Sequence, residues 1–592
     1  MSFAEEAAPM LMTSYAAPLS AEDDTSTPAD TVYVGETELS DGEWTADGLT
    51  DSTGTLPASG YAYYKDGVLT LNNFEYEGEG FCYEKRYYVE DFEYYQYNAL
   101  IYSDAALSIA LEGDNSLCAK SPYFYEENNG FYNSYYTKGI VTNFLEISGS
   151  TNSSLSLNAS DGISAYNGIV ISNSTVAVTA YDGIYSKNDV TITNSTVNID
   201  SYYEGIFVSK GNLTISNSTV DIVSDFYSGI ETSKSNVSIS DSTINILSYG
   251  EGIFISMGSL NIFDSTVDIV SNFYYGIETY RSTVSIAGST VKLVSNEKDG
   301  IYVKYGTVSI TGSTVNLDSC YGAGIYVYNY NSDSNYIGDL AITNSTVTIV
   351  SENNGIYAYG KVNITDSTVT INSNCHGIYT TSRYSQPLPV NETVLTAPDI
   401  IITRSNITID AAYYTLRSET GITLIECELP EDMEIVIVDD EYVDDEDEDS
   451  SDSIPVMLSL TSEIADESNA GESTEEFENP IYTVVDADGQ AVHHLIITYN
   501  KPADDPTDPE TEDTVSPIPN LNLTGIRLTE NGKTKTLPSA IGSRRTLTFT
   551  PAEGYYVADV LVNGKSVGAV EKYTVVTVPS ITVEVIYEEI EG

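Results

Sequence analysis

A phrase that recurs about every 21 to 24 residues constrains the fold of this chain more than any other feature. It consists of Gly-Ile, an x-Val-x-Ile run, a polar corner and then Ser-Thr-Val-x-Ile-x-Ser. Self-similarity at such a period is typical of a solenoid, in which each repeat packs only against its neighbours. The glycines of the Gly-Ile pairs are Gly162, Gly183, Gly205, Gly229, Gly252, Gly276, Gly300, Gly324, Gly355 and Gly377.

One repeat, residues 205–228, indicates how each turn of the solenoid is built. Apolar and polar residues alternate in three short runs, and Val, Ile and Thr dominate, which favours strands over helices. Glycine, asparagine and serine separate the runs, as chain reversal requires. The sequence therefore predicts an all-β fold: a right-handed parallel β-helix with three short strands per coil and a small C-terminal β domain. The apolar members of the runs are Ile206 and Val208, Leu213 and Ile215, and Val220 and Ile222.

Composition shifts along the chain suggest five segments. Residues 418–500 hold no lysine or arginine, and residues 439–449 are rich in carboxylates, which predicts a solvated linker. The last 70 residues read as strands, with Asn563-Gly564 as a hairpin turn. The predicted segments are a disordered leader (1–31), a β-rich cap module (32–120), the parallel β-helix (121–430), an acidic linker with a short β-hairpin (431–522) and a β-grasp-like domain (523–592).

Charge limits the partners of this chain. Its 592 residues carry a net charge of −64, which argues against nucleic acid and anionic membranes as partners. No run of 18 apolar residues is present, so we expect no insertion into a membrane. The start, residues 1–24, lacks the basic and apolar regions of a signal peptide. However, Ser20-Ala21-Glu22 resembles the tail of an export signal, and we expect a secreted or cell-surface protein.

Cysteine usage adds little to this interpretation. The five cysteines fit no zinc-binding spacing and cannot all pair with one another. Cys82 and Cys118 are the only two that we consider as partners in a disulfide.

Two motifs resemble known bacterial families. The unit from Asp182 to Ile199, Asp-Gly-Ile-Tyr-Ser-Lys-Asn-Asp-Val-Thr-Ile-Thr-Asn-Ser-Thr-Val-Asn-Ile, resembles the pectate-lyase-like, non-catalytic carbohydrate-binding β-helix proteins of clostridia. The opening Val32-Tyr-Val-Gly with Gly67-Val-Leu-Thr-Leu-Asn-Asn is similar to the start of large surface proteins of gut Firmicutes. The C-terminal domain resembles the bacterial surface β-repeat, a β-grasp-type module of adhesins. These resemblances imply carbohydrate binding at a cell surface, and the first family is associated with calcium sites.

The residue before each Gly-Ile pair is a candidate metal ligand in three successive coils. Asp161, Asp182 and Glu204 occupy this position, and stacked coils would place them about one strand spacing apart. Such carboxylates repel one another unless a cation lies between them or they bind protons. Carboxylate and backbone oxygens suit calcium, which we expect here as a structural ion. The alternative is a solvated acidic corner without a metal.

Aromatic residues crowd the same corner of the coil. Tyrosine offers a flat apolar face and a polar tip, which suits stacking on sugar rings. The alternative is a ladder of rings that stack on one another and stiffen the solenoid, and the two are compatible. Phe226, Phe273 and Tyr321 share the corner. The predicted glycan-binding residues are Tyr181, Tyr202, Tyr203, Tyr227, Tyr249, Tyr274 and Tyr275.

A polar column at the second corner has a simpler interpretation. Stacked amide and carboxylate side chains there can satisfy the backbone of the turns, so we assign the column a structural role. Its members are Asn173, Asn194, Asn217, Asp241 and Asp264.

Catalysis is the weaker functional hypothesis. Cys375-His376-Gly377 resembles the Gly-His-Gly of polygalacturonases, but the paired aspartates and the Arg-x-Lys partner of β-helix enzymes do not appear in neighbouring coils. We therefore predict an exported, non-catalytic surface protein that binds polysaccharide or host glycan. The alternatives are a structural or adhesive spacer that binds a protein, and a polysaccharide lyase or hydrolase.

Overall fold

The computed structural model describes residues 31–88, 93–128, 131–150, 152–329, 338–381, 400–439 and 480–499, together with most of 523–589. Regular structure in these residues consists of strands only, which confirms the all-β prediction. The chain divides into two compact units, residues 1–258 with 269–277, and residues 259–268 with 278–592. The predicted leader, apart from Thr31, lies outside the described residues, as does the middle of the acidic linker.

The first unit begins with short strands that precede the repeats. β1 (Thr31–Val34) pairs with β2 (Thr37–Ser40), and β3 (Glu43–Thr45), β4 (Tyr61–Lys65) and β5 (Val68–Asn72) form an antiparallel meander. Parallel pairing begins within the predicted cap module. β5 pairs with β9 (Ala106–Glu112), and β6 (Glu75–Gly78) pairs with β10 (Asp114–Ala119), which pairs with β13 (Ser154–Asn158).

Each coil of the first unit contributes three parallel strands. In residues 205–228 these are β19 (Ile206–Val208), β20 (Leu213–Ser216) and β21 (Thr219–Ser224), where the alternation predicts them. They pair in register with their equivalents in the next coil, β22, β23 and β24. The long strands β12 (Phe131–Ser148) and β14 (Asp161–Ser172) serve two positions of a coil. The other strands are β15 (Thr175–Ala180), β16 (Asp182–Ser186), β17 (Val190–Thr193), β18 (Thr196–Ser201), β22 (Ile230–Ser233), β23 (Val237–Ser240), β24 (Thr243–Ser248) and β25 (Ile253–Ser256).

Three recurring residue types explain why the phrase repeats. The alternating Val and Ile side chains point inward and are almost completely buried, as Ile206 and Val220 illustrate. A Cβ on Gly205 would lie 2.3 Å from Ile222 Cγ2 and 2.5 Å from the carbonyl oxygen of Gly229, so only glycine fits there. The serine of Ser-Thr-Val is buried and satisfies the corner backbone: Ser218 Oγ donates to the carbonyl of Ser216 (2.7 Å) and accepts from the amide of Ser195 (3.1 Å).

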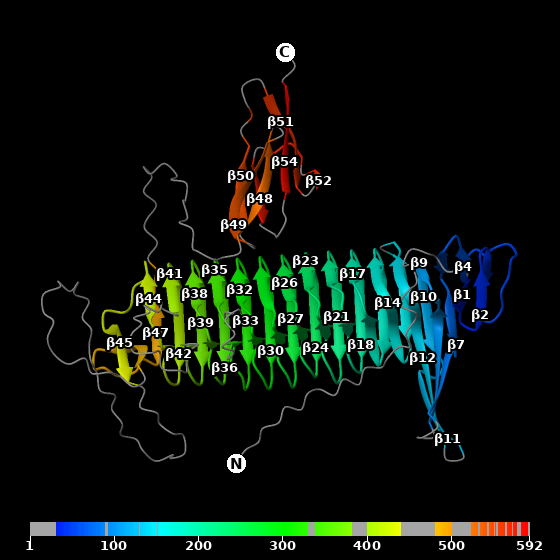
Figure 1. Cartoon of the computed structure of the whole chain (residues 1–592), viewed down its shortest axis with the longest axis horizontal. Helices are drawn as coiled ribbons and strands as arrows, with labels where there is room; N and C mark the ends of the chain where they lie inside the picture. The colour runs from blue at the N-terminus through cyan, green and yellow to red at the C-terminus, as the bar shows by residue number, and fades with distance from the viewer. Residues whose placement is uncertain are drawn as a thin grey trace. The chain divides into compact units, whose positions relative to one another are not determined.

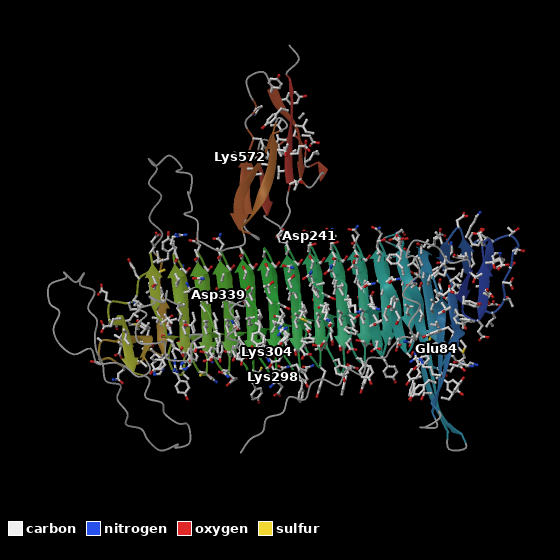
Figure 2. The ribbon with its side chains drawn as sticks, in the orientation of Figure 1. Glu84, Asp241, Lys298, Lys304, Asp339 and Lys572 are labelled. Atoms are coloured by element: carbon white, nitrogen blue, oxygen red, sulfur yellow. The ribbon has the colours of Figure 1, made fainter. Side chains whose placement is uncertain are left out.

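The second corner confirms the structural role of the Asn/Asp column. Asn173, Asn194, Asn217 and Asp241 have φ values of 48° to 51°, in the left-handed region that these residues tolerate. Asn194 Nδ2 also donates to Asn173 Oδ1 at 3.4 Å. Figure 2 labels Asp241 at this edge of the coils.

A narrow arm extends from the first unit (Figure 1). It is a four-stranded sheet in the order β7 (Phe81–Tyr88), β8 (Glu93–Tyr102), β12 and β11 (Tyr123–Asn128). The pairing of β8 with β12 is parallel, and the two outer pairings are antiparallel. Because β12 continues from the arm into the coils, the arm is held rigidly at its base.

The second unit repeats the same coil plan. Its strands include β29 (Thr283–Ala287), β32 (Val308–Thr311) and β35 (Leu340–Thr343), which pair in register and in parallel. The strands β26 (Ser259–Phe263), β27 (Thr266–Ser271) and β28 (Ile277–Tyr280) include the residues at which the two units divide. The remaining coil strands are β30 (Thr290–Ser295), β31 (Ile301–Lys304), β33 (Thr314–Ser319), β34 (Ile325–Tyr328), β36 (Thr346–Ser351), β37 (Ile356–Ala358), β38 (Val362–Thr365), β39 (Thr368–Ser373), β40 (Ile378–Thr380), β41 (Ile400–Thr403), β42 (Asn406–Ala411), β43 (Leu416–Ser418) and β44 (Ile422–Ile425).

Antiparallel strands cover the last coil of the second unit. β45 (Met433–Asp439) pairs with β46 (Pro480–Asp486), which also pairs with β43, and β47 (His494–Ile497) pairs with β42. β45 comes from the start of the segment predicted as an acidic linker, and β46 and β47 come from its second half. They occupy the open sheet edge that a parallel solenoid would otherwise expose.

The C-terminal domain has its own small core. One sheet has the order β49 (Lys533–Ala540), β48 (Leu523–Glu530), β54 (Thr582–Glu589), β51 (Tyr555–Val562) and β52 (Lys565–Ser566), and a second joins β50 (Arg544–Thr548) to β53 (Lys572–Val576). Val562 pairs with Lys565, and the predicted turn residues Asn563 and Gly564 lie outside the described residues. The buried core residues are Leu528, Leu547, Phe549, Val557, Val560, Val583 and Val585.

The described residues contain neither a membrane-spanning helix nor a disulfide. No helix among them is long and apolar enough to cross a membrane. All five cysteines are free, so Cys82 and Cys118 do not form the disulfide that the sequence left open.

Candidate functional site

The aromatic corner of the first unit lies between the third strand of one coil and the first strand of the next. We use this name for Tyr181, Tyr202, Tyr203, Phe226, Tyr227, Tyr249, Phe273, Tyr274 and Tyr275. Buried serines fix the backbone at two of the turns: Ser224 Oγ donates to the carbonyl of Tyr227 at 2.8 Å, and Ser271 Oγ donates to that of Tyr274 at 2.9 Å. With the backbone held inward, the rings project into solvent. Tyr202 is 43% exposed, Phe226 44% and Phe273 49%.

Rings from successive coils stack along this corner. The ring planes of Tyr202 and Phe226 lie 11° apart with centroids at 5.6 Å, those of Phe226 and Tyr249 lie 5° apart at 5.9 Å, and those of Tyr249 and Phe273 lie 17° apart at 4.8 Å. A second row of tilted contacts joins Tyr181, Tyr203 and Tyr227 at 6.1 and 5.5 Å. The ladder interpretation therefore describes the geometry of the corner.

The ladder determines what a ligand would meet. Phe226 has a parallel ring on each side, so its faces lie against Tyr202 and Tyr249 and its edge points outward. The exposed surface is consequently a ribbed apolar strip of ring edges, with tyrosine hydroxyls as donors and acceptors. Such a strip follows the direction in which the coils stack, and it offers an extended polymer repeated contacts at one strand spacing.

The arm extends the aromatic strip beyond the coils. Tyr123 contacts Tyr181 edge to face, with centroids 6.3 Å apart, and lies 5.1 Å from Tyr136. Tyr136 in turn stacks on Tyr97 at 5.4 Å and 18°. Register explains this row, because Tyr97 pairs with Tyr136 and Tyr136 with Tyr123 across adjacent strands. Figure 2 shows ring side chains gathered where the arm leaves the coils, near the labelled Glu84.

The repeat pattern in the sequence did not assign the arm tyrosines to the site. They lie outside the Gly-Ile repeat, so the period gave no reason to align them with the corner. A usable signal was present in the alternation of Tyr95 and Tyr97 and in the Tyr135-Tyr136 pair. Phe226 and Phe273, which we placed at the corner but left out of the predicted glycan-binding residues, are full members of the stack.

The column before Gly-Ile contains a cation that the list of repeats did not include. Lys138 occupies the same position one coil earlier, before Gly139-Ile140, and its Nζ lies 2.5 Å from Asp161 Oδ2. Both side chains are largely buried, at 5% and 12% exposure. Burial alone would lower the pKa of Lys138, but the carboxylates of Asp161 and Asp182 raise it above its ordinary value. An internal ammonium group therefore neutralises part of the predicted acidic column.

Farther along the first unit, burial and neighbouring carboxylates perturb a second group of acids. Glu231, in β22, is largely buried, and burial together with the charges of Glu204 and Glu251 raises its pKa to about 8. The pKa of Glu204 is also raised, chiefly by burial. The proton on Glu231 thus relieves its repulsion with Glu204 and Glu251 at neutral pH.

The predicted metal site has no complete ligand set in the part of the chain that the structure describes. No group of three or more His, Cys, Asp or Glu side chains there could hold a metal ion. Asp161 and Asp182 are in register on neighbouring strands, as predicted, but the Lys138 ammonium occupies the carboxylate of Asp161. Calcium binding by Asp161, Asp182 and Glu204 stays a prediction.

His376 lies in an aromatic setting of the second unit. Its ring stacks on Tyr414 at 5.6 Å and 17°, and its Nδ1 accepts a hydrogen bond from the Tyr414 amide at 3.2 Å. Burial and then the charge of Arg417 lower its pKa to about 4, so the imidazole is neutral at pH 7. These contacts give His376 a packing role, and they provide no acid partner of the kind that a hydrolase requires.

The second unit carries a further ring stack on its first strands. Tyr326, Tyr357 and Tyr379 stack at 4.8 and 4.7 Å, and the Arg417 guanidinium lies 4.6 Å from the centroid of Tyr379. These rings cover one another closely and are only partly exposed. They therefore resemble a stiffening ladder more than an open binding surface.

Comparison with known proteins places the chain in a family. The model of the family described as "Carbohydrate-binding domain-containing protein" matches twice in succession, over residues 103–256 and 256–429, which together make up more than half of the chain. The chain belongs to this carbohydrate-binding family, and its match covers most of the coils in both units. No curated protein and no solved structure matches the chain.

Proposed function

We propose that this chain is an exported, non-catalytic surface protein that binds polysaccharide or host glycan along the aromatic corner of its first unit. One observation carries the proposal: a row of exposed rings that continues from Tyr123 through Tyr181 and Tyr202 to Phe273 in a member of a carbohydrate-binding family. Ring edges and hydroxyls suit the mixed apolar and polar surface of a sugar chain. Export is supported by the acidic composition and by the resemblance to surface proteins, and it stays a prediction.

The acidic character of the first unit selects among sugars. Carboxylates such as Asp182 and the exposed Asp225 lie beside the ring row and would repel a polyuronate backbone. Neutral polymers meet no such repulsion, and their hydroxyls donate readily to carboxylates and tyrosine oxygens. We therefore expect neutral glycans to bind better than pectate.

A glycan array and affinity gel electrophoresis with the full chain test this proposal. Replacing Tyr202 and Phe226 together with alanine removes two neighbouring rungs, and we expect affinity to fall about tenfold or more, since a buried aromatic contact contributes about 0.5–1.5 kcal/mol. Tyr555→Ala is the matched control, because it removes a ring of 44% exposure from the separate C-terminal domain. Binding that survives the double replacement and is lost in the control would contradict the proposal.

The two alternative functions give different results in the same experiments. A blank array, followed by capture of a defined protein partner that depends on Tyr202 and Phe226, would favour the adhesive spacer. Release of reducing ends from pectin, pectate or xylan would favour an enzyme, and we expect none. The contacts of His376 argue against an enzyme: among the described residues its imidazole packs against aromatic rings and lies beside Arg417.

A further inference from the structure

Two cations of the second unit lie on neighbouring coils, at the corner that follows the first strand of each coil. Lys304 is the last residue of β31, and Arg281 directly follows β28. The Arg281 amide donates to the Lys304 carbonyl at 2.7 Å, so the two corners are held one strand spacing apart. Figure 2 labels Lys304 on the coils. Both side chains reach solvent, Arg281 more than Lys304, and one ligand can therefore contact them together.

Neither cation forms an ion pair with a carboxylate among the described residues. Tyrosine rings lie beside them instead. The Arg281 guanidinium carbon lies 5.3 Å from the centroid of Tyr280. Lys304 Nζ lies 5.7 Å from the same centroid and 5.9 Å from those of Tyr305 and Tyr328. Such contacts orient a cation but leave its charge in place. In a chain with 24 basic and 88 acidic residues, two neighbouring cations of this kind indicate a site for an external anion.

The backbone of this corner provides a second, independent observation. Arg281 has a φ of 52°, and Tyr305, at the equivalent position of the next coil, has a φ of 63°. Glycine, asparagine and aspartate tolerate this left-handed region, as they do at the second corner, whereas long side chains disfavour it. Conformations of this kind persist where the surrounding structure enforces them, and they are concentrated at functional sites. The fold thus retains a guanidinium and a phenol at a position where glycine would be less strained.

We propose that Arg281 and Lys304 bind the phosphate group of a phosphorylated sugar. Their two positive charges match the charge of about −1.5 to −2 that a phosphate monoester carries at pH 7. A carboxylate or a sulfate ester carries a single negative charge and would neutralise only one of the two cations. The guanidinium supplies a fork of parallel N–H donors and the ammonium a compact charge, and both suit phosphate oxygens.

The rings beside the two cations suit the sugar that carries the phosphate. The Tyr280 hydroxyl can donate to a phosphate or sugar oxygen, and the ring edges offer an apolar surface. Tyr305 packs on Tyr280 edge to face, with centroids 5.6 Å apart, and this contact holds both rings beside Lys304. The inference goes beyond the proposed function, because it assigns a second class of ligand to the second unit. Glycan binding at the aromatic corner of the first unit does not depend on it.

Isothermal titration calorimetry with the full chain tests this site. The probe is glucose 6-phosphate in calcium-free buffer of low ionic strength, and glucose, glucose 6-sulfate and glucuronate are the comparison ligands. We expect saturable binding of glucose 6-phosphate that is at least about tenfold tighter than binding of the comparison ligands. High salt should weaken it, because ions screen exposed charges. Absence of saturable binding, or equal affinity for glucose 6-phosphate and glucose 6-sulfate, overturns the proposal.

Substitutions locate the binding on the chain. Arg281→Gln combined with Lys304→Gln removes both charges, and we expect the affinity for glucose 6-phosphate to fall at least about tenfold, because charged hydrogen bonds are lost. Lys304→Arg keeps the charge and should retain binding. Lys292→Gln is the matched control, because it removes an exposed cation of the same unit that pairs with Asp268 at 3.4 Å. Affinity that is unchanged in the double variant, or reduced equally in the control, contradicts the assignment.

Lysine labelling gives a readout that needs no variant. Amine acylation followed by mass spectrometry measures how far glucose 6-phosphate protects Lys304, with Lys292 as the internal reference. We expect protection of Lys304 and none of Lys292. Equal labelling of Lys304 with and without the sugar phosphate would mean that the two cations only pack against the rings, and the proposal would then be wrong. Glycan binding by the first unit is measured separately, so either proposal can fail while the other stands.

Discussion

Glu231 allows the charge state of the acidic column to be tested by a single substitution. Its pKa rises from an ordinary 4.5 to about 8, because the side chain is buried near Glu204 and Glu251. The folded state therefore holds the proton more tightly than the unfolded state. Stability due to this group is complete below pH 4.5 and is lost as the pH rises through 8.

The magnitude follows from linkage between proton binding and folding. Between the two pKa values, 4.5 and about 8, the free energy of unfolding falls by about 1.4 kcal/mol per pH unit. The fall amounts to about 3 kcal/mol at pH 7 and to between about 4 and 5 kcal/mol above pH 8. Glu231→Gln keeps the shape of the protonated side chain and removes its titration. We expect the variant to match the parent at pH 4 and to exceed its free energy of opening by about 3–5 kcal/mol at pH 8.

Hydrogen–deuterium exchange is a suitable assay because long repeat arrays often unfold in parts. Peptides spanning β19 to β25 should exchange more slowly in Glu231→Gln than in the parent at pH 8, after correction for intrinsic rates, and equally at pH 5 or below. Asp200→Asn, an exposed carboxylate in the same unit, is the control and should show no such difference. An equal effect at both pH values, or faster exchange in the variant at pH 8, would refute the reasoning.

Three other predictions concern the coils. Gly205→Ala should destabilise the first unit by about 3 kcal/mol or more, because its methyl group would overlap Ile222 and the Gly229 carbonyl, whereas Gly54→Ala at an exposed turn should change the melting temperature little. Ser218→Ala should cost about 1–3 kcal/mol in urea unfolding, because the Ser195 amide loses its partner and the Ser216 carbonyl keeps only the bond from the Asn194 amide, and Ser156→Ala on an exposed position of β13 should be neutral. If the predicted calcium site exists, calorimetry on the chelated full chain will give saturable heat that Asp182→Asn removes; without such heat the prediction fails.

The repeated phrase was sufficient to predict the coil. Alternation identified Ile206, Val208 and Val220 as inward residues, and all three are buried. The column that contains Asn217 was assigned a structural role, and its φ values lie in the left-handed region that asparagine tolerates at a turn. These features depend on contacts between equivalent positions one repeat apart, so a pattern visible in one coil applies to its neighbours.

The site was only partly predictable, because the period relates equivalent positions of the coils and says nothing of residues outside them. Lys138 belongs to the column before Gly-Ile, and extending the period upstream by one repeat to Gly139-Ile140 would have found it. The arm tyrosines could not be found in this way, because Tyr97, Tyr123 and Tyr136 meet through the cross-strand register of a separate sheet. The resemblance to pectate-lyase-like proteins and to a surface β-repeat also stays a prediction.

By itself, the sequence determined which side chains face inward, where the chain turns and at which corner rings and carboxylates collect. Those properties are local, since they follow from strand alternation and from the backbone preferences of glycine and asparagine. Only the tertiary structure decided that the rings cover one another's faces, that Lys138 pairs with Asp161, and that Glu231 holds a proton at neutral pH. Each of these depends on distance and burial across stacked strands, and a linear pattern does not specify the local dielectric or the neighbouring charges that set a pKa.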